Sequence, residues 1–180
     1  MEKIEKIQVV DDFLESKELQ EVFTVLNTIK WNYGHSSITN NDNRNFKTKF
    51  WASPLDAHPL FSKHILGIIE KHFFKKFELK RVYANCNAYG YDGDYHQDDT
   101  SDDTYTFCLY TNTQNKEEME FVGGNLYFKF PELKHQICFE PWNNRGILFP
   151  SKYLHKGVSF KRHVEEVRIS IAWKLKELKT

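Results

Sequence analysis

The sequence predicts an α+β protein that is mainly β, a double-stranded β-helix (jelly roll) flanked by N-terminal helices. Apolar residues recur at helical spacing in two segments before residue 79, and from there they alternate along many short runs. The 15 Phe, 9 Tyr and 4 Trp among 180 residues supply enough apolar surface for a buried core. We therefore expect one domain over residues 1–180, with helical support over about 11–78 and a jelly-roll core over about 79–176.

The first part of the chain predicts two amphipathic helices. Over residues 17–30 the apolar side chains fall at helical spacing, after Asp11, Asp12 and Ser16 as cap candidates. A second helix is expected after Pro59, because proline suits a first helical turn and the following residues have an apolar side. The intervening residues 32–58 are polar and rich in Asn, which indicates a long loop with room for one short strand.

The second part of the chain predicts β-strands. In residues 82–89 small apolar side chains alternate with Tyr and Asn, which is typical of a strand. Turn-rich segments such as Gly123-Gly124 and Asn143-Asn144 separate the later runs. Helices followed by many short strands favour helices packed on an antiparallel sandwich or jelly roll. The further expected strands are 104–111, 125–130, 136–140, 146–149, 155–159 and 167–175.

Composition excludes several classes of protein. Lys+Arg and Asp+Glu both number 25, so no net charge attracts the chain to nucleic acid or to an anionic membrane. No apolar run reaches the roughly 18–20 residues of a membrane span. The start MEKIEKIQVV is charged, so we expect a cytoplasmic protein without a signal peptide. Cys86, Cys108 and Cys138 lack C-x-x-C spacing, which favours buried or half-buried thiols over disulfides or a zinc site.

Three separated motifs carry the candidate chemistry. In Tyr95-His96-Gln97-Asp98 an imidazole and a carboxylate stand two residues apart, so on an extended chain both face one side and can share one ion. A second histidine, His155, follows a strand-like run, and Arg168-Ile169-Ser170 lies on the last expected strand. Each motif alone has an ordinary alternative, such as a solvated turn, a structural histidine, or an arginine paired with Glu165 or Glu166.

Together, the His-x-Asp motif, the distant histidine and the Arg-x-Ser motif resemble the family of iron(II)- and 2-oxoglutarate-dependent oxygenases over about residues 82–173. The spellings Tyr89-Gly90-Tyr91, Tyr95-His96-Gln97-Asp98 and Tyr110-Thr111-Asn112 look most like its prolyl 4-hydroxylase-like branch. The resemblance implies Fe(II) bound by His96, Asp98 and His155, a ligand set that suits this metal. It also implies 2-oxoglutarate and O2 as cosubstrates, with ascorbate as the reductant.

The resemblance further implies the residues that hold 2-oxoglutarate. Arg168, a catalytic candidate beside the metal ligands, is expected to bind the far carboxylate, because a guanidinium pairs bidentately and stays charged when desolvated. Strand parity places Ser170 on the same face as Arg168. Tyr89 and Tyr110 are the expected hydroxyl donors to the cosubstrate.

The implied activity is hydroxylation of an unactivated C–H, in a prolyl residue of a peptide or protein, with decarboxylation of 2-oxoglutarate to succinate and CO2. A free amino acid or another small molecule is the alternative substrate. Nucleic-acid demethylases of the same superfamily are similar, but they carry a second arginine where Lys174 stands. Collagen-type prolyl hydroxylases place Lys at the position of Arg168. A catalytically inert jelly-roll binding module is the non-enzymatic alternative.

The remaining features indicate less. The acidic residues of 92–103 lack the order of a calcium-binding loop and indicate a solvated lid. The histidines at 58, 64 and 72 lack the spacing of a helical metal site, so we expect surface positions. Four aromatic residues bracket the Asn-rich segment and either line a substrate groove or fasten the segment to the sheet: Trp31, Tyr33, Phe50 and Trp51.

Overall fold

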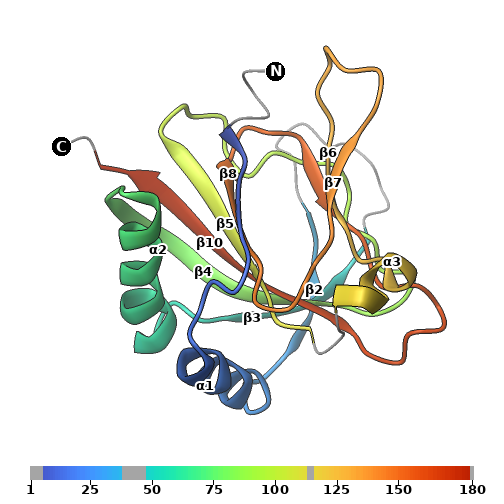
Figure 1. Cartoon of the computed structure of the whole chain (residues 1–180), viewed down its shortest axis with the longest axis horizontal. Coiled ribbons are helices and arrows are strands. Elements are labelled where there is room, and N and C mark those ends of the chain that lie inside the picture. The colour runs from blue at the N-terminus through green and yellow to red at the C-terminus, as the bar shows by residue number, and fades with distance from the viewer. Residues whose placement is uncertain (1–5, 38–47, 113–115, 179–180) are drawn as a thin grey trace.

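The computed structural model describes residues 6–37, 48–112 and 116–178 and consists mostly of antiparallel β-sheet (Figure 1). Seven strands form one sheet in the order β1-β8-β5-β10-β4-β3-β2, and three form a second sheet in the order β7-β6-β9. The helices are α1 (Ser16–Leu26), α2 (Leu66–Phe73) and α3 (Met119–Val122). The strands are β1 (Gln8–Val10), β2 (Asn32–His35), β3 (Phe50–Pro54), β4 (Phe77–Asn87), β5 (Thr104–Tyr110), β6 (Leu126–Phe128), β7 (Ile137–Phe139), β8 (Gly146–Pro150), β9 (His155–Gly157) and β10 (Arg168–Glu177).

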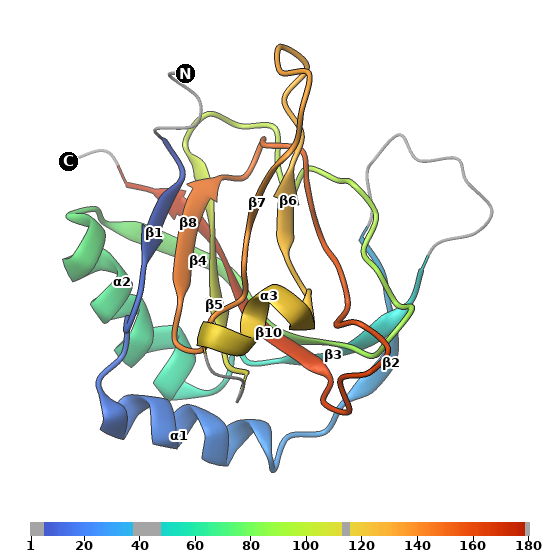
Figure 2. The ribbon, with the colours of Figure 1, turned by 45° about the vertical axis from the view of Figure 1, so that its right-hand side comes forward.

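Helices α1 and α2 cover one face of the larger sheet. The apolar stripe of α1 buries Val22 and Leu26 in the main core, as the helical spacing predicts. After Pro59 the chain forms a π-helical turn at Leu60–Ile65 that continues directly into α2. In Figure 2, α2 lies to the left and α1 below, whereas β6 and β7 stand to the right of β8. The helices therefore leave the other face of the larger sheet to the smaller sheet.

The central strand β10 positions the inner face of the larger sheet. It pairs antiparallel with β4 and with β5, so that Ser170 stands opposite Asn85 on one side and Tyr110 on the other. Because side chains alternate along a strand, every second residue of these three strands faces the same side. On β10 the outward residues Ile171 and Trp173 join the core under the helices. The inward residues are Arg168, Ser170, Ala172 and Lys174 of β10, Tyr83, Asn85 and Asn87 of β4, and Thr106, Cys108 and Tyr110 of β5.

The start of α1 differs from the expected side-chain cap. Its N-cap is Glu15, which makes no capping hydrogen bond through its side chain. Asp11 instead accepts from Arg145, with 2.6 Å from Nε to Oδ1 and 3.0 Å from Nη2 to Oδ2. Asp12 adopts the left-handed conformation with φ of 52°. The acidic pair therefore serves a turn and a tertiary contact, which local sequence signals do not distinguish from a cap.

Residues 32–58 contain two strands where one was expected. β2 and β3 pair with each other, and β3 pairs with β4, so this segment widens the larger sheet. β1 was not expected either and forms the opposite edge of the sheet, paired with β8. These strands have three to five residues, too few for a clear alternation of polar and apolar side chains.

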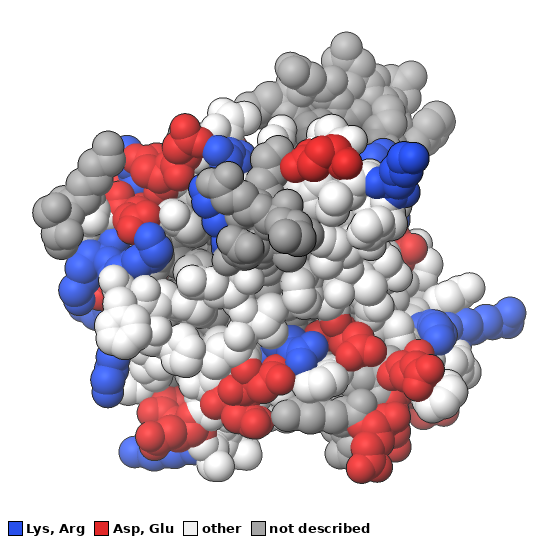
Figure 3. Space-filling model, turned by 45° about the horizontal axis from the view of Figure 1, so that its top comes forward, with Lys and Arg blue, Asp and Glu red and all other residues white. Residues whose placement is uncertain are grey.

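The surface carries mixed charge. On the face in Figure 3, acidic and basic side chains are interspersed rather than gathered in one patch of either sign. Several lysines near the end of α2 form ion pairs, for example Lys76 with Glu70 at 2.8 Å and Lys80 with Glu78 at 2.9 Å. Of the three cysteines, Cys138 is exposed, contrary to expectation, because it lies on β7 at the edge of the smaller sheet. Within the described ranges, no helix is both long enough and apolar enough to cross a membrane.

Candidate metal centre and adjoining cavity

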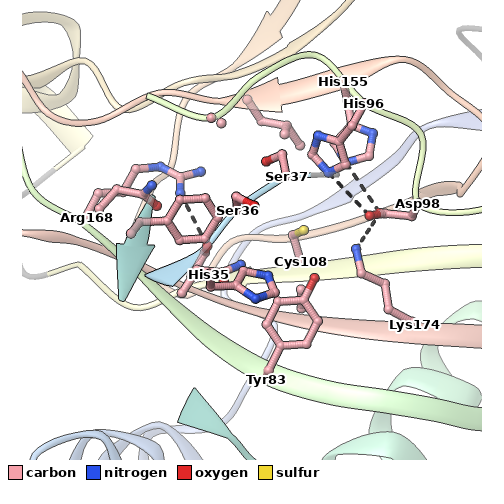
Figure 4. Close-up of a pocket in the computed structure, with 18 of the residues that line it drawn as sticks. His35, Ser36, Ser37, Tyr83, His96, Asp98, Cys108, His155, Arg168 and Lys174 are labelled. Atoms are coloured by element: carbon pink, nitrogen blue, oxygen red, sulfur yellow. Dashed lines mark hydrogen bonds and ion pairs between the residues drawn. The ribbon is translucent and has the colours of Figure 1, made fainter. Parts of the chain in front are cut away.

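His96, Asp98 and His155 come together at the junction of the two sheets. His96 and His155 exchange two backbone hydrogen bonds of 3.0 Å, and the backbone N–H of Asp98 donates to the carbonyl of Ser151 at 2.9 Å. Nε2 of His96 lies 3.4 Å from Oδ1 of Asp98, and Nε2 of His155 lies 3.4 Å from Oδ2. Figure 4 shows both imidazoles facing the carboxylate. In the described part of the chain, this is the one group of three residues that could hold a metal ion.

The second nitrogen of each imidazole is already engaged. Nδ1 of His96 lies 2.8 Å from the carbonyl oxygen of Asp94, and Nδ1 of His155 lies 2.7 Å from that of Tyr153. A carbonyl can only accept, so Nδ1 carries the proton in both rings and Nε2 presents its lone pair towards Asp98. Burial lowers the pKa of His155, which favours the neutral ring that a metal requires. The donor set therefore fits iron(II), which takes two imidazoles and a carboxylate on one face.

Asp98 is a buried carboxylate held by two donors. Thr106 donates its hydroxyl proton to Oδ2 at 2.6 Å, and the ammonium of Lys174 forms an ion pair with the same oxygen. Burial by itself raises the pKa of Asp98, but Lys174 and then His155 outweigh it and hold the pKa well below its usual range. Asp98 is therefore ionised and oriented, with Oδ2 occupied and Oδ1 directed towards His96.

Arg168 lies at the other end of the site and is buried. Its Nε donates to the carbonyl of Gly124 at 2.7 Å, and its Nη1 donates to Oγ of Ser170 at 3.3 Å. The surface ion pair weighed as an alternative is not formed, since no carboxylate in the described ranges pairs with Arg168. A buried cation without a counter-ion is costly, so this position favours an anionic ligand.

The surroundings of Arg168 leave room for such a ligand. A Cβ at Gly157 would lie 3.0 Å from Nη2 of Arg168, so only glycine leaves the guanidinium undisturbed. The ring of Tyr110 has its centre 5.1 Å from the guanidinium carbon. Its hydroxyl is buried without a hydrogen-bond partner in the described part of the chain, and burial raises its pKa, so it keeps a proton to donate. These groups fit a carboxylate such as the far end of 2-oxoglutarate.

A cavity of about 290 Å³ joins the two ends of the site. Figure 4 shows Arg168 on the left and the His96, Asp98 and His155 group on the right, with His35 and Tyr83 below the space between them. Nearly half of the described lining residues, Arg81 among them, lie on the inward face of β4, β5 and β10. Other lining residues come from the β2 end of the sheet, from β6 and from the chain around the metal ligands: His35, Ser36, Ser37, Phe50, Gly93, Gln97, Leu126 and Gly157.

The structure does not bring every expected residue to this cavity. Tyr89 is 60% exposed and does not line the cavity, because β4 ends at Asn87 and the chain then turns at Gly90, where φ is 81°. Lys174 was not expected to belong to the site. It lines the cavity, and strand parity from Arg168 could have identified it.

The aromatic residues near the Asn-rich segment divide between the two expected roles. Phe50 lines the cavity. Tyr33 and Trp51 instead form an aromatic cluster with Tyr91, with ring centres 4.9 Å apart for Tyr33 and Trp51 and 5.6 Å apart for Trp51 and Tyr91. Trp31 packs against the core under the helices. One residue of the four therefore contributes to a pocket, and three fasten the segment.

Neither a protein-family model nor a curated protein matches the chain. Solved structures do match. A prolyl hydroxylase from Trichoplax adhaerens, in complex with a hypoxia inducible factor peptide fragment, has 15% identity and a TM-score of 0.70 over 96% of this chain and 84% of that chain. A prolyl-4-hydroxylase from Pseudomonas putida has 14% identity and a TM-score of 0.68 over 97% and 94%. HygX from Streptomyces hygroscopicus, with nickel and 2-oxoglutarate bound, has 11% identity and a TM-score of 0.63 over 97% and 86%. The chain thus has the fold of prolyl hydroxylases and of 2OG-Fe(II) oxygenases.

Proposed function

We propose that this chain, which has the fold of 2OG-Fe(II) oxygenases, is an Fe(II)- and 2-oxoglutarate-dependent dioxygenase formed as one domain by residues 1–180. One observation carries the proposal. Two imidazoles present Nε2 to an ionised carboxylate, at one end of a cavity whose other end holds a buried arginine that no carboxylate of the described ranges pairs with. When bound, Fe(II), 2-oxoglutarate and O2 supply the chemistry of C–H hydroxylation, with succinate and CO2 as the products of the cosubstrate.

The residues of this chain have separate tasks in the proposal. His96, Asp98 and His155 hold the metal, with both histidines fixed as the Nε2-ligating tautomer by backbone carbonyls. Arg168 binds the far carboxylate of 2-oxoglutarate, and Tyr110 donates its hydroxyl proton to it. Ser170 accepts from Arg168 and so fixes the guanidinium, at a contact of 3.3 Å.

The proposed substrate is a prolyl group. Its support is the likeness of the fold to prolyl hydroxylases, one of them in complex with a peptide fragment. The likeness to a prolyl hydroxylase in complex with a peptide fragment supports a prolyl residue within a peptide or protein. The positive charge of the cavity lining instead supports a free amino acid, the alternative substrate. Nothing on the charged face in Figure 3 favours nucleic acid.

The test is the anaerobic addition of Fe(II) and then 2-oxoglutarate to metal-free protein. The wild type is expected to develop the weak visible charge-transfer band of the chelate. His155→Ala is expected to lose the band, and Arg168→Ala is expected to need at least about tenfold more 2-oxoglutarate, the effect of losing one charge-assisted pair. His72→Ala, at an exposed residue outside the cavity, is the matched control and should behave as wild type.

The enzymatic reaction gives a second readout. With O2 and ascorbate present, succinate should form slowly even without substrate, and Arg168→Ala should suppress it at low 2-oxoglutarate. A folded wild-type protein without the band, or a full band in His155→Ala, would contradict the proposal. An inert binding module would give neither the band nor succinate.

A further inference from the structure

The cavity lining carries more positive charge than the metal and 2-oxoglutarate require. Its described residues include three cationic side chains, Arg81, Arg168 and Lys174, and one carboxylate, Asp98. Lys174 pairs with Asp98, and Arg168 has its counter-ion in the cosubstrate proposed above. The other carboxylate of 2-oxoglutarate is expected at the metal, so the cosubstrate leaves no charge for Arg81. Among the described residues, Arg81 therefore remains without a counter-ion.

Arg81 lies on β4 and lines the cavity, and its side chain is exposed to solvent. It stands directly opposite Lys174 in the pairing of β4 with β10. Because Lys174 is paired with Asp98, its repulsion of Arg81 is reduced, and the guanidinium of Arg81 can attract a further anion. The guanidinium carbon of Arg81 lies 5.0 Å from the centre of the Tyr83 ring, a cation–π contact that orients it. No carboxylate in the described ranges forms an ion pair with Arg81.

Asn85, in the same wall, has a side-chain oxygen that lacks a hydrogen-bond donor. It follows Arg81 and Tyr83 at two-residue spacing on β4 and also lines the cavity. Its Oδ1 is buried without a hydrogen-bond partner in the part of the chain that the structure describes. A buried acceptor without a donor costs about 1–3 kcal/mol. A ligand that brings an N–H to this oxygen would therefore be favoured.

His35 closes the wall without adding charge. Its ring centre lies 5.3 Å from that of Tyr83 and 5.2 Å from that of Phe50. Burial, and then the charges of Arg81 and Lys174, lower the pKa of His35, so it is neutral at pH 7. Arg81 is thus the one cation of this wall that is available to a substrate.

We propose that Arg81, Tyr83 and Asn85 form a carboxylate subsite, and that the substrate is a free amino acid such as proline. Its carboxylate pairs with Arg81, and its ammonium donates to Oδ1 of Asn85. The inference rests on the proposed function and selects the free form of the substrate, because an internal prolyl residue has neither group. The C-terminal residue of a peptide offers the same carboxylate from another source.

The test measures binding to the protein loaded with Fe(II) and 2-oxoglutarate, without O2, by calorimetry. The probes are the free proteinogenic L-amino acids, the amide of each one that binds, a peptide ending in that residue, and a prolyl peptide blocked at both ends. We expect at least one amino acid to bind, and its amide to bind about 10- to 100-fold more weakly, as expected for the loss of a charged hydrogen bond. A C-terminal peptide that binds as tightly as the free acid would overturn the assignment of the ammonium to Asn85.

Variants separate the two contacts. Arg81→Met keeps an apolar side chain against Tyr83. It should lower the affinity for the free amino acid to that for its amide, while the affinity for 2-oxoglutarate stays unchanged. Asn85→Leu should lower the affinities for the free amino acid and for its amide equally, because both carry the ammonium. Arg162→Met, at an exposed arginine outside the lining, is the matched control and should have no effect.

The failures are distinguishable. If the chelate band forms but no amino acid binds, or if Arg81→Met leaves the affinity for the acid unchanged, the subsite is wrong and the oxygenase proposal stands. If the blocked internal peptide binds as tightly to Arg81→Met as to wild type, the substrate is peptidyl and the subsite is again wrong. If wild type gives no chelate band, both proposals fail.

Discussion

Lys174 holds Asp98 ready for a metal. A carboxylate with 5% of its side chain exposed is costly to ionise, and a protonated Asp98 would be a poor ligand. Lys174 and Thr106 both contact Oδ2, so the negative charge is stabilised while Oδ1 stays free. We therefore assign Lys174 a positioning role, through Asp98, rather than a catalytic one.

Lys174→Met should destabilise the metal-free protein by about 3–5 kcal/mol, because it leaves a buried carboxylate without its cation. The measurement is urea unfolding with a chelator present. Metal binding should recover part of the loss, since the metal replaces the missing positive charge. Consequently, the stabilisation by Fe(II) should be larger in Lys174→Met than in wild type, which a merely structural lysine would not cause.

Lys176→Met is the control for this substitution. Lys176 lies on the same strand, and its pair with Asp103 at 3.7 Å is partly exposed, so its loss should cost less than about 1 kcal/mol. Equal effects of the two substitutions would show that Lys174 is no more than another surface charge.

The cysteines differ in reactivity for a physical reason. Burial raises the pKa of Cys86 to about 11 and that of Cys108 to about 11, whereas Cys138 is exposed. At pH 8, only roughly 0.1% of a thiol with such a pKa is in the reactive thiolate form. Iodoacetamide should therefore label Cys138 alone in the folded protein, as read by peptide mass spectrometry. Cys138→Ser should abolish rapid labelling, and comparable rates at Cys108 would refute the prediction.

Motifs and strand parity together account for what the sequence can reveal about single residues. The order of His96, Asp98, His155 and Arg168 along the chain was enough to propose one site, and the structure brings all four to one cavity. The Arg-x-Ser motif does not include Lys174, although the alternation on β10 continues to it. The residues around Tyr89 do not indicate where β4 ends, and the strand ends two residues before it, at Asn87.

At the scale of elements, strands bounded by turn-rich segments in the second half of the chain were predictable, and the short strands of the first half were not. The strands β4 to β10 fall within or close to the expected ranges, because turn residues delimit these runs in the sequence. β1, β2 and β3 lie towards the edges of the larger sheet, where exposure removes the contrast between the two faces. Their pairing depends on neighbours distant in sequence, which a local pattern does not contain.

Gly157 on β9 should matter for the cosubstrate rather than for the fold. Gly157→Ala places a Cβ 3.0 Å from Nη2 of Arg168, and the guanidinium, fixed by its bond to Gly124, must shift. We expect roughly tenfold weaker 2-oxoglutarate binding, the equivalent of one charge-assisted hydrogen bond. Titration of the chelate band measures this, and urea unfolding should show little change.

Gly67 in α2 provides the opposite case. A Cβ there meets no atom within 4 Å. Gly67→Ala should raise stability by about 0.5–1 kcal/mol through its helix propensity, and it should leave 2-oxoglutarate binding unchanged. If both glycine variants altered 2-oxoglutarate binding alike, the effect could not be assigned to Arg168.

At the scale of the whole molecule, the net charge is zero, so any electrostatic attraction of a ligand must come from local groups of charged side chains. The chain has 25 basic and 25 acidic residues, and its surface charges are mixed on the face in Figure 3. The cavity concentrates Arg81, Arg168 and Lys174 in one space. We therefore expect the anionic cosubstrate and the carboxylate substrate proposed above to be attracted by the positive charge of this cavity.

The same arrangement makes the stability of the metal-free protein depend on pH. Burial, followed by Arg81 and Lys174, lowers the pKa of His35, and burial lowers that of His155 against the pull of Asp98. In the unfolded chain both histidines titrate near pH 6.5. Below that pH the unfolded state binds protons that the folded state does not, so stability falls as the pH drops from about 7 towards the folded pKa values.

Urea unfolding with a chelator, at about pH 7.5, 6.5 and 5.5, should show this fall, with a slope of up to about 1.4 kcal/mol per pH unit for each histidine. His35→Gln removes one of the two groups and should reduce the slope, whereas the exposed His72→Gln should leave it unchanged. Asp98 does not contribute to this slope. Its pKa is lowered in the folded protein, so its protonation changes stability only below about pH 3.9, the pKa of Asp in the unfolded chain. Constant or rising stability from pH 7.5 to 5.5 would mean that neither ring is kept neutral, and the cavity would then not favour Nε2 as a metal ligand.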